Sequence, residues 1–231
     1  MASGSVSPIT LPSGERKPAA LRLGFASWPI GGGQVPELRS IGFGIDSRVR
    51  FRRDLPSCPL SELYEAKRRP CPGSVVGQGW VASEITPEGS PPAAVEGKLV
   101  AFYSQTHRQA RILARVVTGE PLPVVYVIPF KIDRADGGFG PRLTATRERM
   151  HRIVGKCVAD HPNCFAQPYA LKGAYSRISR FKMSLERGFV EASCPATSRD
   201  ESEKPLLRAD LDFEDEADAT VTVPQVCHAA G

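Results

Sequence analysis

The densest group of side chains that could bind a metal lies in HRIVGKCVADHPNC, residues 151–164. His151, Cys157, His161 and Cys164 offer imidazole and thiolate groups, which are ligands that zinc prefers in proteins. Their spacing matches none of the common zinc-finger patterns, in which the paired ligands stand close together in both halves. A local disulfide between the two cysteines accounts for the same residues, so we expect no metal site and no cofactor here.

All six cysteines can be paired, because their number is even. Proximity in the sequence favours the bridges Cys58–Cys71, Cys157–Cys164 and Cys194–Cys227, although the sequence leaves the connectivity open. Most of these cysteines stand beside Pro, Gly or Asn, which is typical of loops. Disulfides persist in oxidising compartments, so we expect an exported protein, extracellular or associated with the cell envelope. The alternative is a cytosolic protein with six reduced thiols.

A basic stripe in SRVRFRRD is the sharpest candidate for a binding surface. In an extended strand Arg48, Arg50 and Arg52 share one face, while Val49 and Phe51 share the other. The alternative is a solvated strand face or a sheet edge guarded by charge.

The net charge of +5 is unevenly distributed along the chain. Residues 200–231 carry nine acids against two basic residues, so residues 1–199 carry a net charge of +12. A basic body of this kind attracts anionic polymers such as nucleic acid, anionic lipid or cell-wall phosphate. We expect no specific nucleic-acid recognition, because the chain lacks an aromatic stacking motif. The alternative is a solubilising surface that pairs with the acidic segment of the same chain.

Motifs for catalysis are weak, and we expect no catalytic residues. The chain contains neither GxSxG nor HExxH, and its one SxxK match, Ser179 to Lys182, falls on an expected strand rather than the helical turn that this motif needs. Five alternating acids could share a strand face and its turn and attract calcium: Asp210, Asp212, Glu214, Glu216 and Asp218. They lack the EF-hand spacing, and an acidic hairpin docked on the basic body explains them as well. A carboxylate-based hydrolase or carbohydrate-active enzyme is the alternative function.

The element that organises the fold is VVYVIPFKI, Val124 to Ile132. This short apolar run, rich in β-branched and aromatic residues and preceded by breakers, predicts a central strand buried on both faces. Pro129 cannot donate to a sheet ladder, so the strand must bulge there, change sheets or leave an edge exposed. With 21 glycines and 21 prolines spread along the chain, we predict an all-β, antiparallel, disulfide-linked β-sandwich.

The remaining elements follow from periodicity and breakers. Residues 1–19 read as a flexible leader, and residues 20–231 as one domain that ends in an acidic hairpin at 206–223. Ser57 to Arg69 predicts one short helix, capped by Ser57 and stopped by Pro70. Residues 172–187 predict a strand with Phe181, Met183 and Leu185 facing inward.

Membrane and export signals are not visible in the sequence. No apolar stretch is long enough for a transmembrane helix. No basic segment followed by an apolar run opens the chain, so either the protein is cytosolic or a signal peptide has been removed. The oligomeric state stays open.

Seven phrases of the chain resemble a family of uncharacterised exported proteins from high-GC actinobacteria. The phrases, within roughly residues 36–195, are LPSC (55–58), CPGSVVGQG (71–79), GKLVAFY (97–103), YVIPFKI (126–132), GGFGPRLTAT (137–146), ISRFKMSLER (178–187) and FVEASCP (189–195). The resemblance implies a β-sandwich and export by a cleaved signal peptide, and it supplies no catalytic residues. Together these observations predict an exported structural or binding protein, with an anionic polymer or another cell-envelope component as its partner.

Overall fold

The computed structural model describes most of the chain. It covers residues 1–28, 34–64, 70–86, 91–106, 109–119, 124–135, 138–146, 156–157, 175–194, 205–214, 216–224 and 227–230. For residues 156–157, 175–176, 205 and 229–230 it describes the backbone alone.

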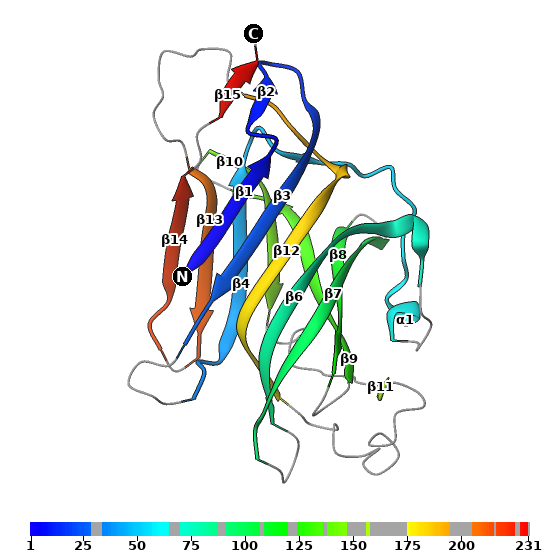
Figure 1. Cartoon of the computed structure of the whole chain (residues 1–231), viewed down its shortest axis with the longest axis vertical. Coiled ribbons are helices and arrows are strands. Elements are labelled where there is room, and N and C mark those ends of the chain that lie inside the picture. The colour runs from blue at the N-terminus through cyan, green and yellow to red at the C-terminus, as the bar shows by residue number, and fades with distance from the viewer. Residues whose placement is uncertain are drawn as a thin grey trace.

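Strands make up most of the described structure (Figure 1). In chain order they are β1 (Ala2–Ser7), β2 (Thr10–Pro12), β3 (Lys17–Ala26), β4 (Leu38–Asp46), β5 (Arg50–Phe51), β6 (Val75–Thr86), β7 (Ala93–Thr106), β8 (Gln109–Thr118), β9 (Val124–Arg134), β10 (Phe139–Thr146), β11 (Lys156–Cys157), β12 (Tyr175–Ala192), β13 (Pro205–Phe213), β14 (Ala219–Pro224) and β15 (His228–Ala230). A one-turn α-helix, α1 (Leu60–Leu63), and a 3-10 turn, η2 (Pro72–Ser74), lie between β5 and β6.

One continuous antiparallel sheet carries the fold. Its strand order is β1-β3-β12-β6-β7-β8-β9-β10-β4-β13-β14, with β5 paired to β12 and β11 paired to β9. Only β2 and β15, among the described strands, form a separate pair, and it is parallel. The predicted all-β, antiparallel class is therefore confirmed.

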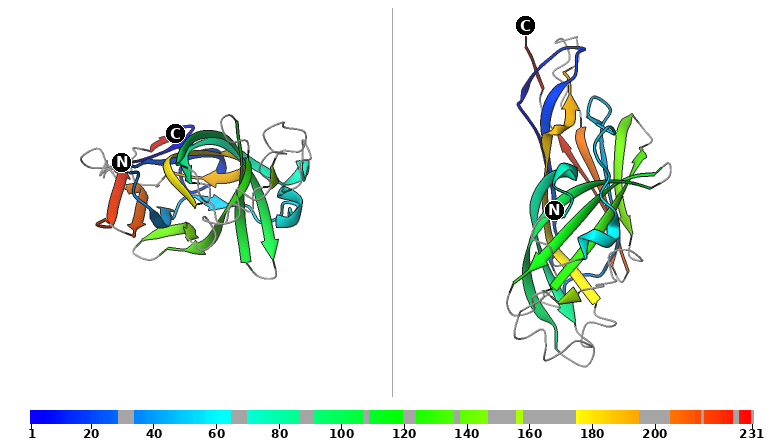
Figure 2. Two further views of the ribbon diagram at one scale, coloured as in Figure 1. Left: turned by 90° about the horizontal axis from the view of Figure 1, so that it is seen from below. Right: turned by 90° about the vertical axis from the view of Figure 1, so that its right-hand side faces the viewer.

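The sheet curls until its two ends almost meet. Gly4 of β1 packs on Leu207 of β13, so closely that a Cβ on Gly4 would lie 2.8 Å from Leu207 Cδ2. Seen from below in Figure 2, the strands follow the outline of a flattened ring. Long strands with register shifts, as in β12 between Leu185 and Val190, twist and bend enough to close a sheet in this way. The architecture is a nearly closed barrel rather than a clear sandwich.

Aromatic side chains fill the inside of this barrel. Phe25 of β3, Phe43 of β4, Phe130 of β9 and Phe181 of β12 come from different parts of the sheet and meet with ring centroids 5.5–6.4 Å apart. All four are almost fully buried. These rings therefore fill the centre of the barrel.

The predicted central strand is confirmed as β9, which lies between β8 and β10 and is buried from Val124 to Phe130. Pro129 stands opposite Leu113 of β8. On the other side of β9, the ladder to β10 begins only at Lys131, and β11 pairs with Val124 and Val125. Within the described residues, the stretch around Pro129 therefore has a ladder on one side only, as the lack of an N–H on Pro129 requires, although its side chains are buried rather than exposed.

The strand and alternation predicted for residues 172–187 are confirmed from Tyr175 onward, and residues 172–174 lie outside the described part of the chain. Phe181, Met183 and Leu185 are buried, while Lys182 is exposed. The observed strand is longer, because β12 continues through Gly188 to Ala192 and there takes β5 as an additional partner.

The flexible leader predicted for residues 1–19 is wrong, because residues 2–7 form strand β1, residues 10–12 form β2 and residues 17–19 begin β3. Strand β1 pairs with β3 from Ala2↔Phe25 to Ser7↔Ala20. Its small polar residues resemble a linker in the sequence, but backbone pairing to β3 and the burial of Val6 hold them in place.

The predicted helix is shorter than expected at its start. Helix α1 begins after Pro59, without a side-chain cap, and residues 65–69 lie outside the described part of the chain. The Ser57 hydroxyl is used elsewhere: its Oγ accepts the Gln105 backbone N–H at 2.8 Å and lies 3.2 Å from the Gln105 carbonyl oxygen. Ser57 therefore ties this segment to β7 instead of capping the helix.

Candidate binding groove on the outer sheet face

Two of the three predicted disulfides are confirmed. Cys58–Cys71 and Cys194–Cys227 have Cα–Cα distances of 5.6 and 5.7 Å. The first encloses α1 and holds it against the outer face of the sheet. The second joins the end of β12 to the start of the C-terminal strand β15. The pair Cys157–Cys164 and the histidines of residues 151–164 lie outside the residues whose side chains are described.

Ion pairs interrupt the predicted arginine stripe. Arg48 contacts Asp46 through two guanidinium nitrogens, at 2.8 and 2.6 Å, and Arg52 contacts Asp54 in the same way at 3.0 and 2.6 Å. These contacts raise the pKa of both arginines, chiefly through the hydrogen bond to the carboxylate. Arg50, between them, has no ion-pair partner among the described residues. Of the three arginines, Arg50 therefore lies outside a direct ion pair, although the hydrogen bond from Arg52 and, to a smaller extent, the charge of Arg50 lower the pKa of the Asp54 carboxyl group.

Arginines also bind the acidic hairpin formed by β13 and β14. Asp210 pairs with Arg208 at 2.8 Å and with Arg142 of β10 at 3.3 Å. Asp212 pairs with Arg39 of β4 at 3.5 Å. These contacts agree with an acidic hairpin docked on basic residues of the same chain.

The SxxK match lies on β12, as predicted from the sequence. Ser179 Oγ donates to the Ala82 carbonyl oxygen at 3.2 Å. Lys182 lies beyond the register shift between Ile178 and Arg180 and lines a groove that Ser179 does not line. Ser179 therefore hydrogen-bonds the neighbouring strand, whereas Lys182 is part of the groove lining.

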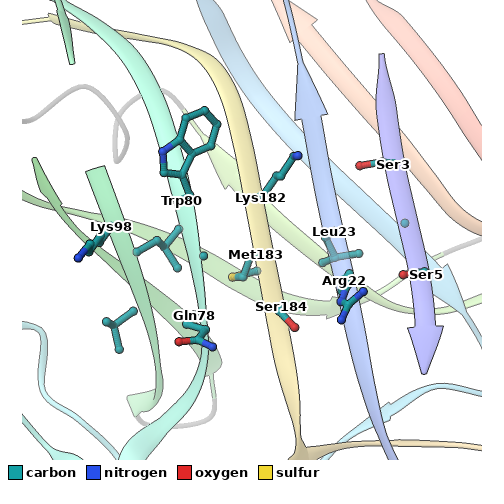
Figure 3. A pocket seen from close by; sticks show the side chains of 14 residues that line it. Ser3, Ser5, Arg22, Leu23, Gln78, Trp80, Lys98, Lys182, Met183 and Ser184 are labelled. Atoms are coloured by element: carbon teal, nitrogen blue, oxygen red, sulfur yellow. The ribbon is translucent and has the colours of Figure 1, made fainter. Parts of the chain in front are cut away.

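That groove has a volume of about 640 Å³. It runs across β1, β3, β12, β6 and β7 on the outside of the sheet, where these strands lie side by side (Figure 1). Figure 3 shows the side chains that line it. The groove is therefore assembled from strands far apart in the sequence.

Strand register arranges the lining side chains in two rows. In the first row Gly24, Lys182, Trp80 and Lys98 stand opposite one another on β3, β12, β6 and β7. In the second row Arg22, Ser184, Gln78 and Val100 do the same. Residues directly opposite in such ladders lie about 5 Å apart, so each row is a continuous set of neighbours.

Small residues make the floor and long residues make the walls. At Gly24 a Cβ would lie 2.8 Å from the Phe181 carbonyl oxygen and 3.0 Å from Ser3 Oγ, so a larger residue would displace the neighbouring strands. Ser184, between Arg22 and Gln78, leaves a second low point. Trp80, half-buried, rises between the two lysines.

The charge in the groove is positive and uncompensated. Among the described residues, its lining includes Arg22, Lys98 and Lys182 but neither Asp nor Glu. None of the ion pairs seen among the described residues involves these three cations. Glu96, two residues before Lys98 on β7, faces the same side but lies outside the lining. The groove can therefore attract an anion without first breaking an internal ion pair.

Helix α1 lies beyond one end of the second row. Arg115 of β8 stands opposite Val100 and would extend the row, but its Nε donates to the Leu63 carbonyl oxygen at 2.8 Å. Burial lowers the pKa of this arginine. The Cys58–Cys71 bridge thus holds helix α1 against the outer face of the sheet, beside the groove.

Sequence reasoning missed the groove and overestimated the stripe. The ion pairs had a visible signal, because Asp46 and Arg48, like Arg52 and Asp54, stand only two residues apart in the sequence. Arg48 lies in the turn after β4, and Arg52 and Asp54 follow β5, so the three arginines do not share one strand. The groove had only a weak signal: each strand contributes an isolated basic or aromatic residue, and its neighbours come from other strands.

The chain matches no protein-family model, no curated protein and no solved structure. In the part of the chain that the structure describes, no helix has the length and apolarity of a membrane span.

Proposed function

We propose that this chain is an exported binding protein whose outer groove holds a segment of an anionic cell-envelope polymer. The observation that carries the proposal is the set of three cations around Trp80, in a groove whose lining contains no carboxylate among the described residues. Because these cations have no ion-pair partner among the described residues, no ion pair has to break before they bind an anionic ligand. Their positive charge is therefore available to attract such a ligand.

The form of the groove favours a polymer over a compact ligand. It crosses several strands and is open to solvent, with Lys182 and Lys98 on either side of Trp80. Because adjacent strands are about 4.8 Å apart, the two lysines are spaced by about 10 Å, which allows contact with successive charged units. The Trp80 ring supplies an apolar face for a sugar ring, and Ser3, Ser5, Ser184 and Gln78 supply hydrogen-bonding groups.

An oxidising compartment outside the cytoplasm is the location that fits the disulfides. Two bridges at normal Cα–Cα distances support folding in an oxidising environment. An acidic glycan or a phosphate-containing wall polymer is the anion that such a protein would meet there. This placement agrees with the exported proteins that seven phrases of the chain resemble.

The test measures binding to heparin and to a poly(glycerol phosphate) at low and moderate salt. Wild-type protein should bind weakly, with an affinity that falls as counterions are released, at a log–log slope of about −2 to −3 for three contacts. The variant Arg22→Gln/Lys98→Gln/Lys182→Gln should lose most of both the affinity and the slope. The side chains are outward-facing, so thermal unfolding should change little.

A matched control removes the same charge elsewhere. Arg39→Gln/Lys131→Gln/Arg208→Gln also removes three positive charges, all from half-exposed ion pairs outside the groove. If this control weakens binding as much as the groove variant does, binding follows net charge alone and the groove has no special role. Salt-independent binding would also overturn the proposal.

A further inference from the structure

A second hollow, of about 410 Å³, lies between β5 and the β9–β10 hairpin. Three arginines from two segments line it: Arg50 on β5 and Arg53 just after it, and Arg134 at the end of β9. We propose that this hollow binds a compact phosphoryl anion, such as pyrophosphate or the phosphate end of a larger molecule, independently of the outer groove.

The backbone around the three arginines is held by specific contacts. At Gly140 a Cβ would lie 2.7 Å from the Ser47 Cα, so the turn after β4 packs directly on β10. The Ala135 N–H donates to the Gly140 carbonyl oxygen at 2.8 Å, which closes the hairpin next to Arg134. The Tyr103 hydroxyl lies 3.2 Å from the Arg53 carbonyl oxygen and ties that residue to β7. The site therefore rests on a fixed frame.

The three guanidinium groups have no ion-pair partner among the described residues, and the nearby carboxylates are mostly occupied. Asp133, which also lines the hollow, pairs with Lys131 at 2.9 Å. Asp54 pairs with Arg52. Glu191 stands opposite Arg50 in the β5–β12 ladder, and no ion pair joins these two described side chains. In the part of the chain that the structure describes, the hollow consequently keeps an excess of positive charge.

Residue type distinguishes this site from the groove. All three of its cations are arginines, whose planar guanidinium donates two parallel hydrogen bonds to one phosphate or carboxylate group. Apolar side chains of Phe51, Ile132 and Pro141 form part of the wall. An anion seated against them would be partly shielded from water, which strengthens charge-assisted hydrogen bonds.

Calorimetric titration with sodium pyrophosphate at low salt tests the site. Wild-type protein should bind one equivalent with saturable heat. Arg53→Gln/Arg134→Gln should weaken binding by about tenfold or more, since one charge-assisted hydrogen bond is worth at least about that factor. Arg53→Lys/Arg134→Lys keeps the charge but loses the paired donors, so it should also weaken binding clearly. The control Arg39→Gln/Arg208→Gln, with equal charge loss, should bind as wild type does.

Three outcomes would overturn the site: no saturable heat in the wild type, equal losses in the site and control variants, or lysine variants that bind as tightly as wild type. A parallel titration with glycerol phosphate identifies the source of the anion, because binding of both ligands supports a phosphate end and binding of pyrophosphate alone supports a free anion. Near-UV circular dichroism confirms that each variant is folded. Failure of the groove variants to affect polymer binding would leave this result untouched, since the two sites share no residue.

Discussion

Lys182 of β12 and Trp80 of β6 stand directly opposite each other in the antiparallel ladder, with their side chains on the outer face of the sheet. A charge and an aromatic face are thus neighbours, presented to the same ligand. The two residues should contribute in ways that can be separated, because salt screens the charge and leaves the ring contact unchanged.

Trp80→Ala should weaken polymer binding without changing its salt dependence. Stacking on an aromatic ring is worth about 1 kcal/mol or more, and no counterion is released with it. Lys182→Gln should instead reduce the log–log salt slope by about 0.7–0.9, the contribution of one charge contact. Affinity measurements at four salt concentrations check both. If the plots of log affinity against log salt concentration have the same slope for Lys182→Gln and for wild type, this lysine makes no charge contact with the polymer.

Gly79→Ala should destabilise the protein by about 1–3 kcal/mol, the usual cost of forcing extra volume into a packed site. A Cβ at this position would lie 2.0 Å from the Lys182 carbonyl oxygen, so β6 and β12 would have to separate. Denaturant unfolding measures the change. Gly188→Ala is the matched control, because a Cβ there meets no described atom within 4 Å. Equal destabilisation by both substitutions would contradict the packing argument.

Removing the two described disulfides should have unequal effects. The Cys194–Cys227 bridge spans 33 residues and the Cys58–Cys71 bridge spans 13. From loop-closure entropy, paired Cys→Ser substitutions should cost about 4 kcal/mol for the first and about 3 kcal/mol for the second. Unfolding in denaturant under non-reducing conditions gives both values. A larger loss for the shorter loop would point instead to packing around α1.

Stability should fall as the pH rises above about 10. Burial raises the pKa of Tyr103 and of Tyr64, so the folded protein keeps protons that the unfolded chain has already released. The contribution of these two protonated tyrosines to the free energy of unfolding is fully present below the ordinary tyrosine pKa of about 10 and is lost as the pH rises above it. Unfolding midpoints between neutral and alkaline pH measure the decline. Tyr103→Phe, which removes the ionising group, should make that decline shallower, and an unchanged slope would exclude Tyr103 as a cause.

Local patterns predicted individual strands well. The alternation of Phe181, Met183 and Leu185 in β12 and the apolar run of β9 are properties of a few consecutive residues, and both strands form as expected. Adjacent charges were predictable too, since Arg48 and Asp46 are two residues apart.

Pairing between distant segments was beyond the reach of those patterns. The sequence of β1 resembles a linker, because β1 is held in place by its pairing with β3 and its packing on Leu207. Neither contact can be recognised from the residues of β1 themselves. For the same reason the closure of the sheet and the groove around Trp80 could not be predicted. The groove residues Arg22, Trp80, Lys98 and Lys182 lie up to 160 positions apart, and only the strand order brings them together.

The Cys194–Cys227 bridge also determines how the chain would carry a pulling force. Tension applied at the two ends passes from β15 through the sulfur atoms directly into β12, and so bypasses β13 and β14. The bypassed segment, 33 residues at about 3.4 Å each, would contribute about 110 Å to the length of a stretched, reduced chain and almost nothing to the oxidised one. Stretched in its oxidised form, the molecule would behave as a shorter tether than its residue number implies, with the acidic hairpin carrying no load.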